Sequence, residues 1–225
     1  MIPSMPAPTF DGSFPHRWTA EILPQRPMIL PSRHYVYPGA VEEVERGALE
    51  VLIRPEGASE PFLATCALGF RDPAAPTGIW SMPHPDWLCA VSGGYAYLVD
   101  VTAPDRFSML RYRPVLNIYR YSSTEFGKTE TDYPKAADDL LLFVGHHSIL
   151  AWGYDGEAWE SDRLSWEGVT ADRFEGNILH GHGWDLMTDK DLPFALDLKT
   201  GKRLQEKLTQ SDRTLNPVPT SNAKE

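Results

Sequence analysis

The chain has 225 residues and an ordinary globular mix of 42% hydrophobic and 23% charged residues, which is enough apolar material for a sizeable core. It carries 21 Lys and Arg against 31 Asp and Glu, a net charge of -10. This charge disfavours nucleic-acid and anionic-membrane partners, and the length suits one all-β domain.

The N-terminal residues and the cysteines point to a soluble, cytoplasmic protein. Met1 to Pro6 lack the basic and apolar regions of a signal peptide, and the longest uncharged apolar run, Leu140 to Val144, is far too short to span a membrane. Cys66 and Cys89 fit no metal-binding or redox spacing. We expect two buried thiols, although the sequence leaves their pairing open.

Residues 1–38 hold eight prolines, so this segment cannot form a long helix or a central strand. It is also rich in apolar residues, including Trp18 and Ile29. We therefore predict an extended arm that packs on the domain or mediates contact with a protein partner or a second copy. Residues 39–204 are predicted to form a single β domain, and residues 205–225 a polar flexible tail.

Alternation of apolar and polar residues predicts strands throughout the central domain. The segments are Leu49 to Ile53, Phe62 to Phe70, Tyr95 to Val101, Val115 to Tyr121, Leu140 to Val144, Val169 to Glu175 and Phe194 to Leu198. Helix signals are confined to a turn or two at Val41 to Arg46 and Pro134 to Asp139. The fold class is therefore all-β, an antiparallel meander of hairpins that is propeller-like or sandwich-like.

The sharpest local signal is Asp155-Gly156, a dipeptide typical of two-residue hairpin turns. With that loop, Trp152 pairs directly with Trp159 on one face of the hairpin.

An imperfect internal repeat has a period of 97 residues. The shift places Trp87 on Trp184, Tyr97 on Phe194 and Asp100 on Asp197. Strands with polar turns at such spacings are typical of propeller blades, and a sandwich has a similar pattern.

The segment Ala195-Leu196-Asp197-Leu198-Lys199-Thr200-Gly201 resembles the Ala-x-Asp-x-x-Thr-Gly core of quinoprotein-type β-propeller repeats. In such a turn the aspartate accepts hydrogen bonds from backbone amides and the glycine takes a positive φ. Gln205 stands where the repeat usually has tryptophan. The resemblance implies blade-like hairpins, and it does not extend to the quinone cofactor or to dehydrogenase chemistry.

Histidines mark the places where chemistry could occur. His180 and His182 are one residue apart, so on a strand they would point the same way and could share a metal ion. The segment resembles part of the His-x-His-x-Asp-His motif of metallo-β-lactamase-like hydrolases, but Asp185 is one place late and no histidine follows it. A cupin-like site would need a glutamate where Leu186 and Met187 stand.

A second interpretation uses loop aromatics and imidazoles as a pocket for a small polar or carbohydrate-like ligand. Its residues would be His84, Trp87, His180, His182 and Trp184. The pair His146-His147 is explained by packing, with one side chain on each side of the sheet.

No catalytic motif is found, neither a nucleophile elbow nor a phosphate loop. The leading hypothesis is a non-catalytic binding or interaction protein with no cofactor and no catalytic residue. The alternative is a metal-dependent, hydrolase-like enzyme that uses His180 and His182.

Overall fold

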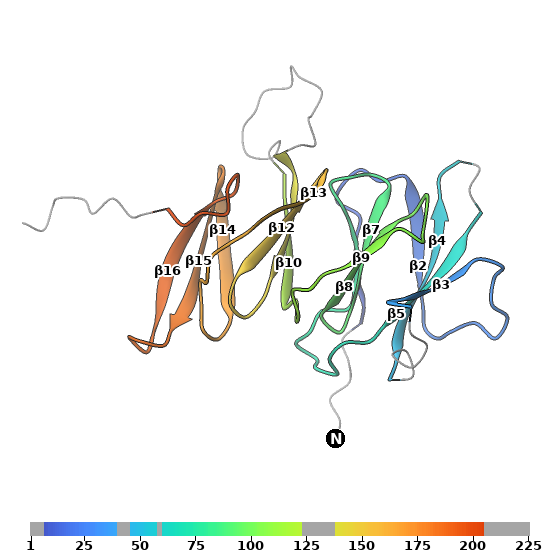
Figure 1. Cartoon of the computed structure of the whole chain (residues 1–225), viewed down its shortest axis with the longest axis horizontal. Coiled ribbons are helices and arrows are strands. Elements are labelled where there is room, and N and C mark those ends of the chain that lie inside the picture. The colour runs from blue at the N-terminus through green and yellow to red at the C-terminus, as the bar shows by residue number, and fades with distance from the viewer. Residues whose placement is uncertain (1–6, 40–45, 58–59, 123–137, 205–225) are drawn as a thin grey trace, which may run out of the picture.

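The computed structural model describes residues 7–39, 46–57, 60–122 and 138–204, and these ranges contain sixteen β-strands and no α-helix. The predicted all-β fold is therefore confirmed. The two short helices predicted from the sequence fall almost entirely outside the described residues. The strands form four sheets that stand side by side in a row (Figure 1).

The first two sheets hold nine strands. Sheet I has the order β2-β4-β5-β3, with β2 at Trp18–Leu23, β4 at Ala48–Pro55, β5 at Phe62–Ala67 and β3 at His34–Tyr37. Sheet II has the order β1-β6-β7-β8-β9, with β1 at Thr9–Asp11, β6 at Gly78–Ser81, β7 at Trp87–Ser92, β8 at Tyr95–Asp100 and β9 at Phe107–Met109. The pairs β1–β6 and β3–β5 are parallel, and the other pairs in these sheets are antiparallel.

The last two sheets are antiparallel meanders in chain order. Sheet III contains β10 at Asn117–Tyr121, β11 at Leu140–Val144, β12 at Ile149–Gly153 and β13 at Gly156–Glu160. Sheet IV contains β14 at Val169–Glu175, β15 at Ile178–Asp185 and β16 at Lys190–Asp197.

Each neighbouring pair of sheets shares a hydrophobic core. In β8, Tyr97 and Val99 pack toward sheet I, whereas Ala96 and Leu98 pack toward sheet III. Such burial of both faces requires a strand that is apolar at every position, because successive side chains alternate between faces. Sheet III is covered in the same way by sheets II and IV. The inner sheets are thus held from both sides, and the sheets at the two ends of the row from one.

The proline-rich segment contributes β1, β2 and β3, all of which are edge strands. None of its prolines lies within these three strands, as expected for residues that cannot donate a backbone hydrogen bond. Trp18 and Tyr37 are buried in the core between sheets I and II.

The hairpin at residues 149–160 is confirmed, but its predicted register is wrong. Gly153 pairs with Gly156, so Tyr154 and Asp155 form the loop, and Gly156 takes a φ of 130°. A bulge then shifts the pairing, and Trp159 lies opposite Ala151. A slip of one residue moves a side chain to the other face of a strand. Trp152 and Trp159 consequently pack into different cores.

The turn predicted from the quinoprotein-type motif is present at the end of β16. Asp197 Oδ1 accepts a hydrogen bond from Lys199 N at 2.9 Å, and Gly201 has a φ of 67°. Asp100 ends β8 in a similar way and accepts from Thr102 N at 2.9 Å. Trp87 begins its strand, whereas Trp184 lies near the end of its own, so these two residues are not equivalent.

Cys66 and Cys89 are both buried and free, and burial raises the pKa of each thiol. Among the described residues no helix has the length and apolar character needed to span a membrane.

Candidate functional site

The five residues predicted to line a pocket are not brought together. His84 lies in the β6–β7 connection and Trp87 begins β7 of sheet II, whereas His180, His182 and Trp184 belong to β15 of sheet IV. Sheet III stands between the two groups (Figure 1). The structure therefore offers two separate places for these residues, and a ligand role for either group stays a prediction.

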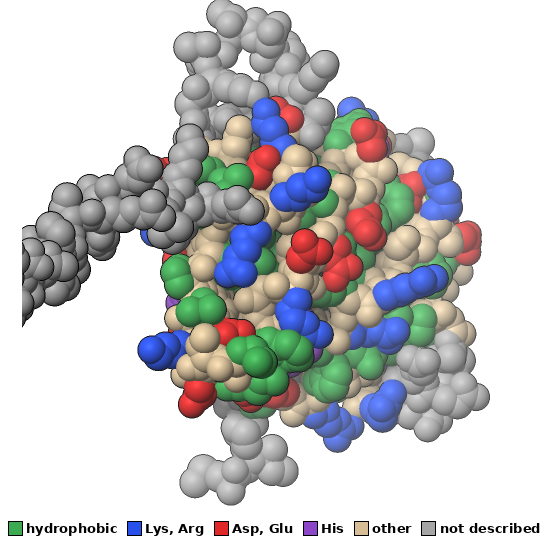
Figure 2. Space-filling view, turned by 60° about the vertical axis from the view of Figure 1, so that its left-hand side comes forward, with side chains coloured by type: hydrophobic (Ala, Val, Ile, Leu, Met, Phe, Trp, Pro, Cys, Tyr) green, Lys and Arg blue, Asp and Glu red, His purple; other side chains and the backbone are tan. Residues whose placement is uncertain are grey.

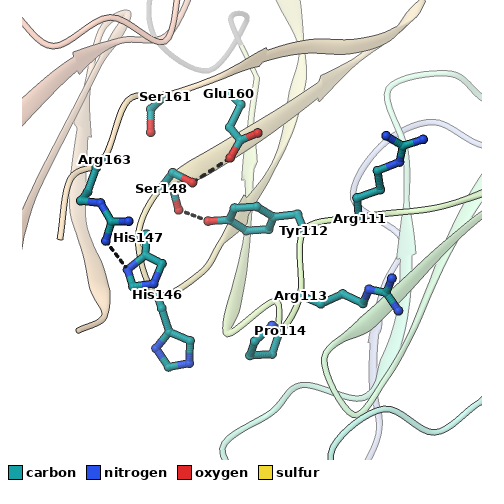
Figure 3. Close-up of a pocket in the computed structure, with 10 residues that line it drawn as sticks. All are labelled: Arg111, Tyr112, Arg113, Pro114, His146, His147, Ser148, Glu160, Ser161 and Arg163. Carbon is teal, nitrogen blue, oxygen red and sulfur yellow. Dashed lines mark hydrogen bonds between the residues drawn. The ribbon is translucent and has the colours of Figure 1, made fainter. Parts of the chain in front are cut away.

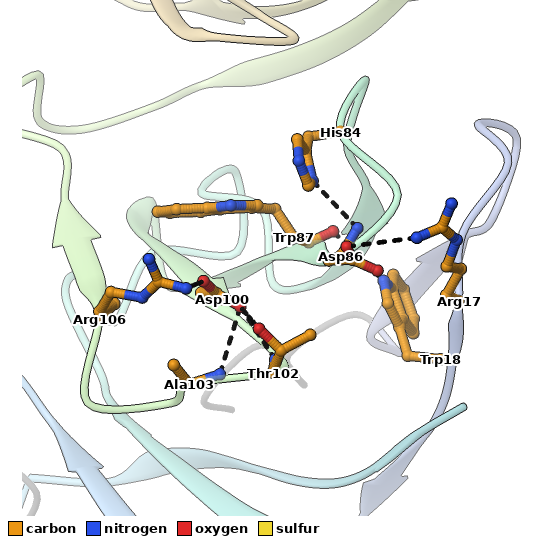
Figure 4. Close-up of polar contacts among 9 residues, drawn as sticks. All are labelled: Arg17, Trp18, His84, Asp86, Trp87, Asp100, Thr102, Ala103 and Arg106. Atoms are coloured by element: carbon orange, nitrogen blue, oxygen red, sulfur yellow. Dashed lines mark hydrogen bonds and ion pairs between the residues drawn. The ribbon is translucent and has the colours of Figure 1, made fainter. Parts of the chain in front are cut away.

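The contacts of His84 and Trp87 stabilise the backbone around them (Figure 4). His84 Nδ1 accepts from Asp86 N at 3.2 Å, and the His84 ring lies 4.6 Å from the Tyr154 ring of sheet III. The carbonyl oxygen of Trp87 accepts from Trp18 Nε1 at 3.2 Å.

Beside them, the buried Asp100 accepts from Thr102 and Ala103 and forms an ion pair with Arg106 (Figure 4). Through these contacts the Asp100 carboxylate stabilises the β8–β9 turn. The two carboxylates drawn in the figure, Asp86 and Asp100, are thus each paired with an arginine, Arg17 and Arg106.

His180 and His182 lie on one face of β15, as the one-residue spacing requires, because the residues between and beside them are buried. His182 Nδ1 is 3.0 Å from Asp172 Oδ2. His180 Nε2 is 3.2 Å from Glu175 Oε2, although the geometry of that contact is not that of a hydrogen bond. Within the described residues, no group of three or more His, Cys, Asp or Glu side chains could hold a metal ion.

A cleft between sheets II and III collects a different set of residues, and we name it the II–III cleft (Figure 3). Its volume is about 460 Å³. Its walls come from three segments: the β9–β10 connection, the β11–β12 turn, and the end of β13 with the residues that follow it. The lining residues are Arg111, Tyr112, Arg113, Pro114, His146, His147, Ser148, Glu160, Ser161 and Arg163.

Close packing of Tyr112 on Gly145 shapes this cleft. A Cβ atom at Gly145 would lie 2.6 Å from the tyrosine hydroxyl oxygen, so the ring fits only against a glycine. The Tyr112 hydroxyl donates to the Ser148 carbonyl oxygen. Burial raises the pKa of Tyr112, and its hydrogen bonds at Ser148 and Gly145 oppose that shift. The neutral Tyr112 side chain therefore links the β9–β10 connection to the β11–β12 turn.

The polar groups on the sheet III side of the cleft are connected in two pairs. Ser148 Oγ donates to Glu160 Oε1 at 2.9 Å. Arg163 Nη1 lies 3.1 Å from His147 Nδ1. Figure 3 shows Tyr112 pointing toward Ser148, whereas Arg111 and Arg113 leave the backbone on the opposite side of the same segment. The side chains of those two arginines therefore point away from the wall that carries His147 and Arg163, and Arg113 lies over the Tyr95 ring of sheet II.

Positive charge dominates the cleft. Arg111, Arg113 and Arg163 form no ion pair with any carboxylate in the described part of the chain, and Glu160 is the one acidic side chain in the lining. Five arginines elsewhere do have carboxylate partners: Arg17, Arg26, Arg54, Arg106 and Arg173. Elsewhere among the described residues, Arg33, Arg46, Arg71 and Arg203 also form no ion pair, so the distinguishing feature of the cleft is that three such arginines line it together.

Two of these guanidinium groups are held against aromatic rings. Arg113 Cζ lies 5.0 Å from the centre of the Tyr95 ring, and Arg163 Cζ lies 4.3 Å from that of Trp166. Contacts of this kind hold the two cations in place, and Arg163 Nη1 also lies within hydrogen-bonding distance of His147 Nδ1. The arrangement suits the binding of an anion.

Sequence reasoning missed this site. His146 and His147 were explained by packing with one side chain inward, but both are exposed. The available signal was the cluster Arg111-x-Arg113, which stands close to no acid in the sequence. Nothing in the sequence showed that residues 111–113, 146–148 and 160–163 would meet.

No family model, no curated protein and no solved structure matches this chain.

Proposed function

We propose that this protein is a non-catalytic binding protein that takes a small anionic ligand in the II–III cleft. The observation that carries the proposal is the set of three arginines without carboxylate partners, together with two exposed histidines, around one cleft of an acidic chain. Guanidinium groups recognise carboxylate, phosphate and sulfate through paired N–H donors.

The size of the cleft supports the same proposal. A volume of about 460 Å³ lies within the range of small-molecule sites. The wall of the cleft is formed by turns and connections on a rigid two-sheet support, which is where binding residues commonly lie. Three arginines at one cleft are too few to form the extended basic surface that nucleic-acid binding uses.

The hydroxyl groups of the cleft favour binding over catalysis. Ser148 Oγ donates to Glu160, and Ser161 Oγ donates to the Asp162 carbonyl oxygen while accepting from Ile149 N. Neither hydroxyl is hydrogen-bonded to an imidazole, as an activated serine nucleophile would be. The alternative enzyme hypothesis, with His180 and His182 as metal ligands, gains no third ligand in the described residues.

The scaffold that supports the site is consistent with a propeller-like order of blades. Four sheets follow one another in the row, and each neighbouring pair shares a core. In this arrangement the cleft is framed by sheets II and III, which share a core.

The proposal is tested by titrating inorganic sulfate into the full chain by calorimetry at low, constant ionic strength. We expect saturable binding by the wild type, weakened by about tenfold or more in an Arg111→Gln, Arg113→Gln, Arg163→Gln variant, because each charged hydrogen bond contributes roughly 1.5–3 kcal/mol.

The control makes the same change in net charge at Arg17, Arg54 and Arg173, which have carboxylate partners. This variant should bind sulfate as the wild type does. Equal weakening in the two variants would mean that net charge, and not the cleft, attracts the anion. Absence of binding by the wild type would overturn the proposal.

A further inference from the structure

The contacts of His147 bear on how the II–III cleft is regulated. Its Nδ1 atom faces two groups at once: Arg163 Nη1 at 3.1 Å and the Ser165 carbonyl oxygen at 3.2 Å. The guanidinium group can only donate a hydrogen bond, and the carbonyl oxygen can only accept one. A single ring nitrogen therefore cannot satisfy both partners in one protonation state.

Two states of the imidazole follow from this geometry. When Nδ1 is bare, it accepts from Arg163, and the proton of the neutral ring is on Nε2. When Nδ1 carries a proton, it donates to the Ser165 carbonyl oxygen, and the guanidinium group loses its acceptor. If Nε2 keeps its own proton, the ring is then a cation beside Arg163, and like charges disfavour that contact.

We propose that His147 is a proton-dependent latch on Arg163: protonation of Nδ1 releases the guanidinium group to the anionic ligand, so that anion binding takes up a proton. This inference rests on the proposed anion-binding function and adds its regulation. The proton comes from the solvent and remains on the imidazole. The protonated ring adds a second positive charge and a second set of donors to the same wall of the cleft.

The surroundings of His147 are compatible with both states. His146 from the same turn has its ring centre 6.1 Å away. Glu160 of β13 lines the same cleft but is engaged by Ser148, and Arg111 and Arg113 line the cleft from the β9–β10 connection. The His147 carbonyl oxygen accepts from Leu164 N at 2.7 Å, which fixes the backbone next to Arg163. His147 itself is exposed, so solvent protons reach it.

The direction of the pH effect follows from this linkage. Histidine side chains generally change charge between pH 5 and 8. In the protonated form Arg163 is released and His147 is positive, so anions bind more tightly. In the form with a bare Nδ1, Arg163 is held by the neutral ring. Reciprocity requires that a bound anion favour the protonated form of His147.

The test uses inorganic sulfate, which keeps the same charge between pH 5.5 and 8, at constant ionic strength. We expect wild-type affinity to be about tenfold higher at pH 5.5 than at pH 8, since a gained charged hydrogen bond is worth roughly one such factor. Calorimetry in buffers of different ionisation enthalpy should show proton uptake on binding at pH 7.

The matched variants are His147→Gln and His146→Gln. Each removes one titratable imidazole from the cleft, but only the first removes the latch. The pH dependence should fall below about threefold in His147→Gln and persist in His146→Gln, in keeping with the loss of a single charged contact.

A readout without ligand separates this inference from the proposed function. At pH 8, nitrogen chemical shifts of the His147 ring should show a bare Nδ1 and a protonated Nε2. The opposite tautomer would overturn the latch and leave the anion site standing. Sulfate binding with equal affinity at both pH values would do the same. No sulfate binding at either pH would overturn both proposals.

Discussion

Histidines in two regions of the molecule have opposite electrostatic partners. On the outer face of sheet IV, His180 and His182 each lie beside one carboxylate, at 3.2 and 3.0 Å. In the II–III cleft, His147 lies 3.1 Å from a guanidinium group. The side chain is the same, and its partners decide what it can bind.

The support beneath the two regions also differs. The cleft lies between two sheets that share a core. Sheet IV, in contrast, packs against a neighbouring sheet on only one of its two faces, and His180 and His182 lie on the other face. A precise site needs side chains held by such packing. Three changes test this contrast, from the largest expected effect to the smallest.

Truncation of the shared core should have the largest effect. Leu98 is fully buried between sheets II and III. Leu98→Ala should lower the free energy of unfolding by about 2–5 kcal/mol, because the lost contacts leave a cavity. The same substitution at Leu192, which is exposed on sheet IV, should cost less than about 1 kcal/mol. Urea denaturation measures both, and equal costs would contradict the contrast in support.

A methyl group at Gly145 should have an intermediate effect that is confined to the cleft. Its Cβ would lie 2.6 Å from the Tyr112 hydroxyl oxygen and displace the ring, so Gly145→Ala should destabilise the protein by about 1–3 kcal/mol.

Gly153→Ala is the control, because the nearest atom to its Cβ is 3.7 Å away. The control should be nearly neutral, and thermal melts distinguish the two variants. A Gly145→Ala protein as stable as the wild type would show that Tyr112 is not held as described.

The smallest effect is a pH dependence of stability at another histidine, His34. Burial lowers the pKa of His34, the Arg26 cation lowers it further, and Glu50 partly opposes both. The folded protein thus binds fewer protons there than the unfolded chain. The stabilising contribution is complete above a pH of about 6.5 and is lost as the pH falls below it.

Thermal melts at pH 7.5, 6.5 and 5.5 check this direction. The loss of stability on acidification should be smaller in His34→Gln than in the wild type. A larger loss in His34→Gln would contradict the stated sign.

Local patterns predicted much of the fold. Alternation located β4, β5, β8, β10, β11, β14 and β16, since a buried face imposes a period of two on the sequence. Strands β6, β7, β9 and β15 were not predicted, and β1, β2 and β3 lie in the segment that was predicted to be an extended arm. Strand β7, Trp87–Ser92, is buried along most of its length on both faces, and β15 carries two glycines, which weaken a strand pattern. The register at Trp159 was missed because the loop begins one residue earlier than the Asp-Gly signal indicates, and because the bulge that follows leaves no sequence signal of its own.

The candidate site was less predictable than the fold. Sequence reasoning chose His180 and His182 by their spacing, and the spacing does place them on one strand face. It had no means of seeing that Asp172 and Glu175 face them, or that Arg163 meets His147 across the β13–β14 connection. Charge pairing depends on tertiary contacts, and those contacts distinguish the two groups of histidines.

The most direct test of the account is a residue-resolved NMR titration of the full chain with sulfate. The account predicts saturable shifts at residues 111–113, 146–148 and 163, with no shifts for His180 and His182 on sheet IV. Shifts centred on sheet IV, or an unchanged spectrum, would contradict the claim that the II–III cleft is the binding site.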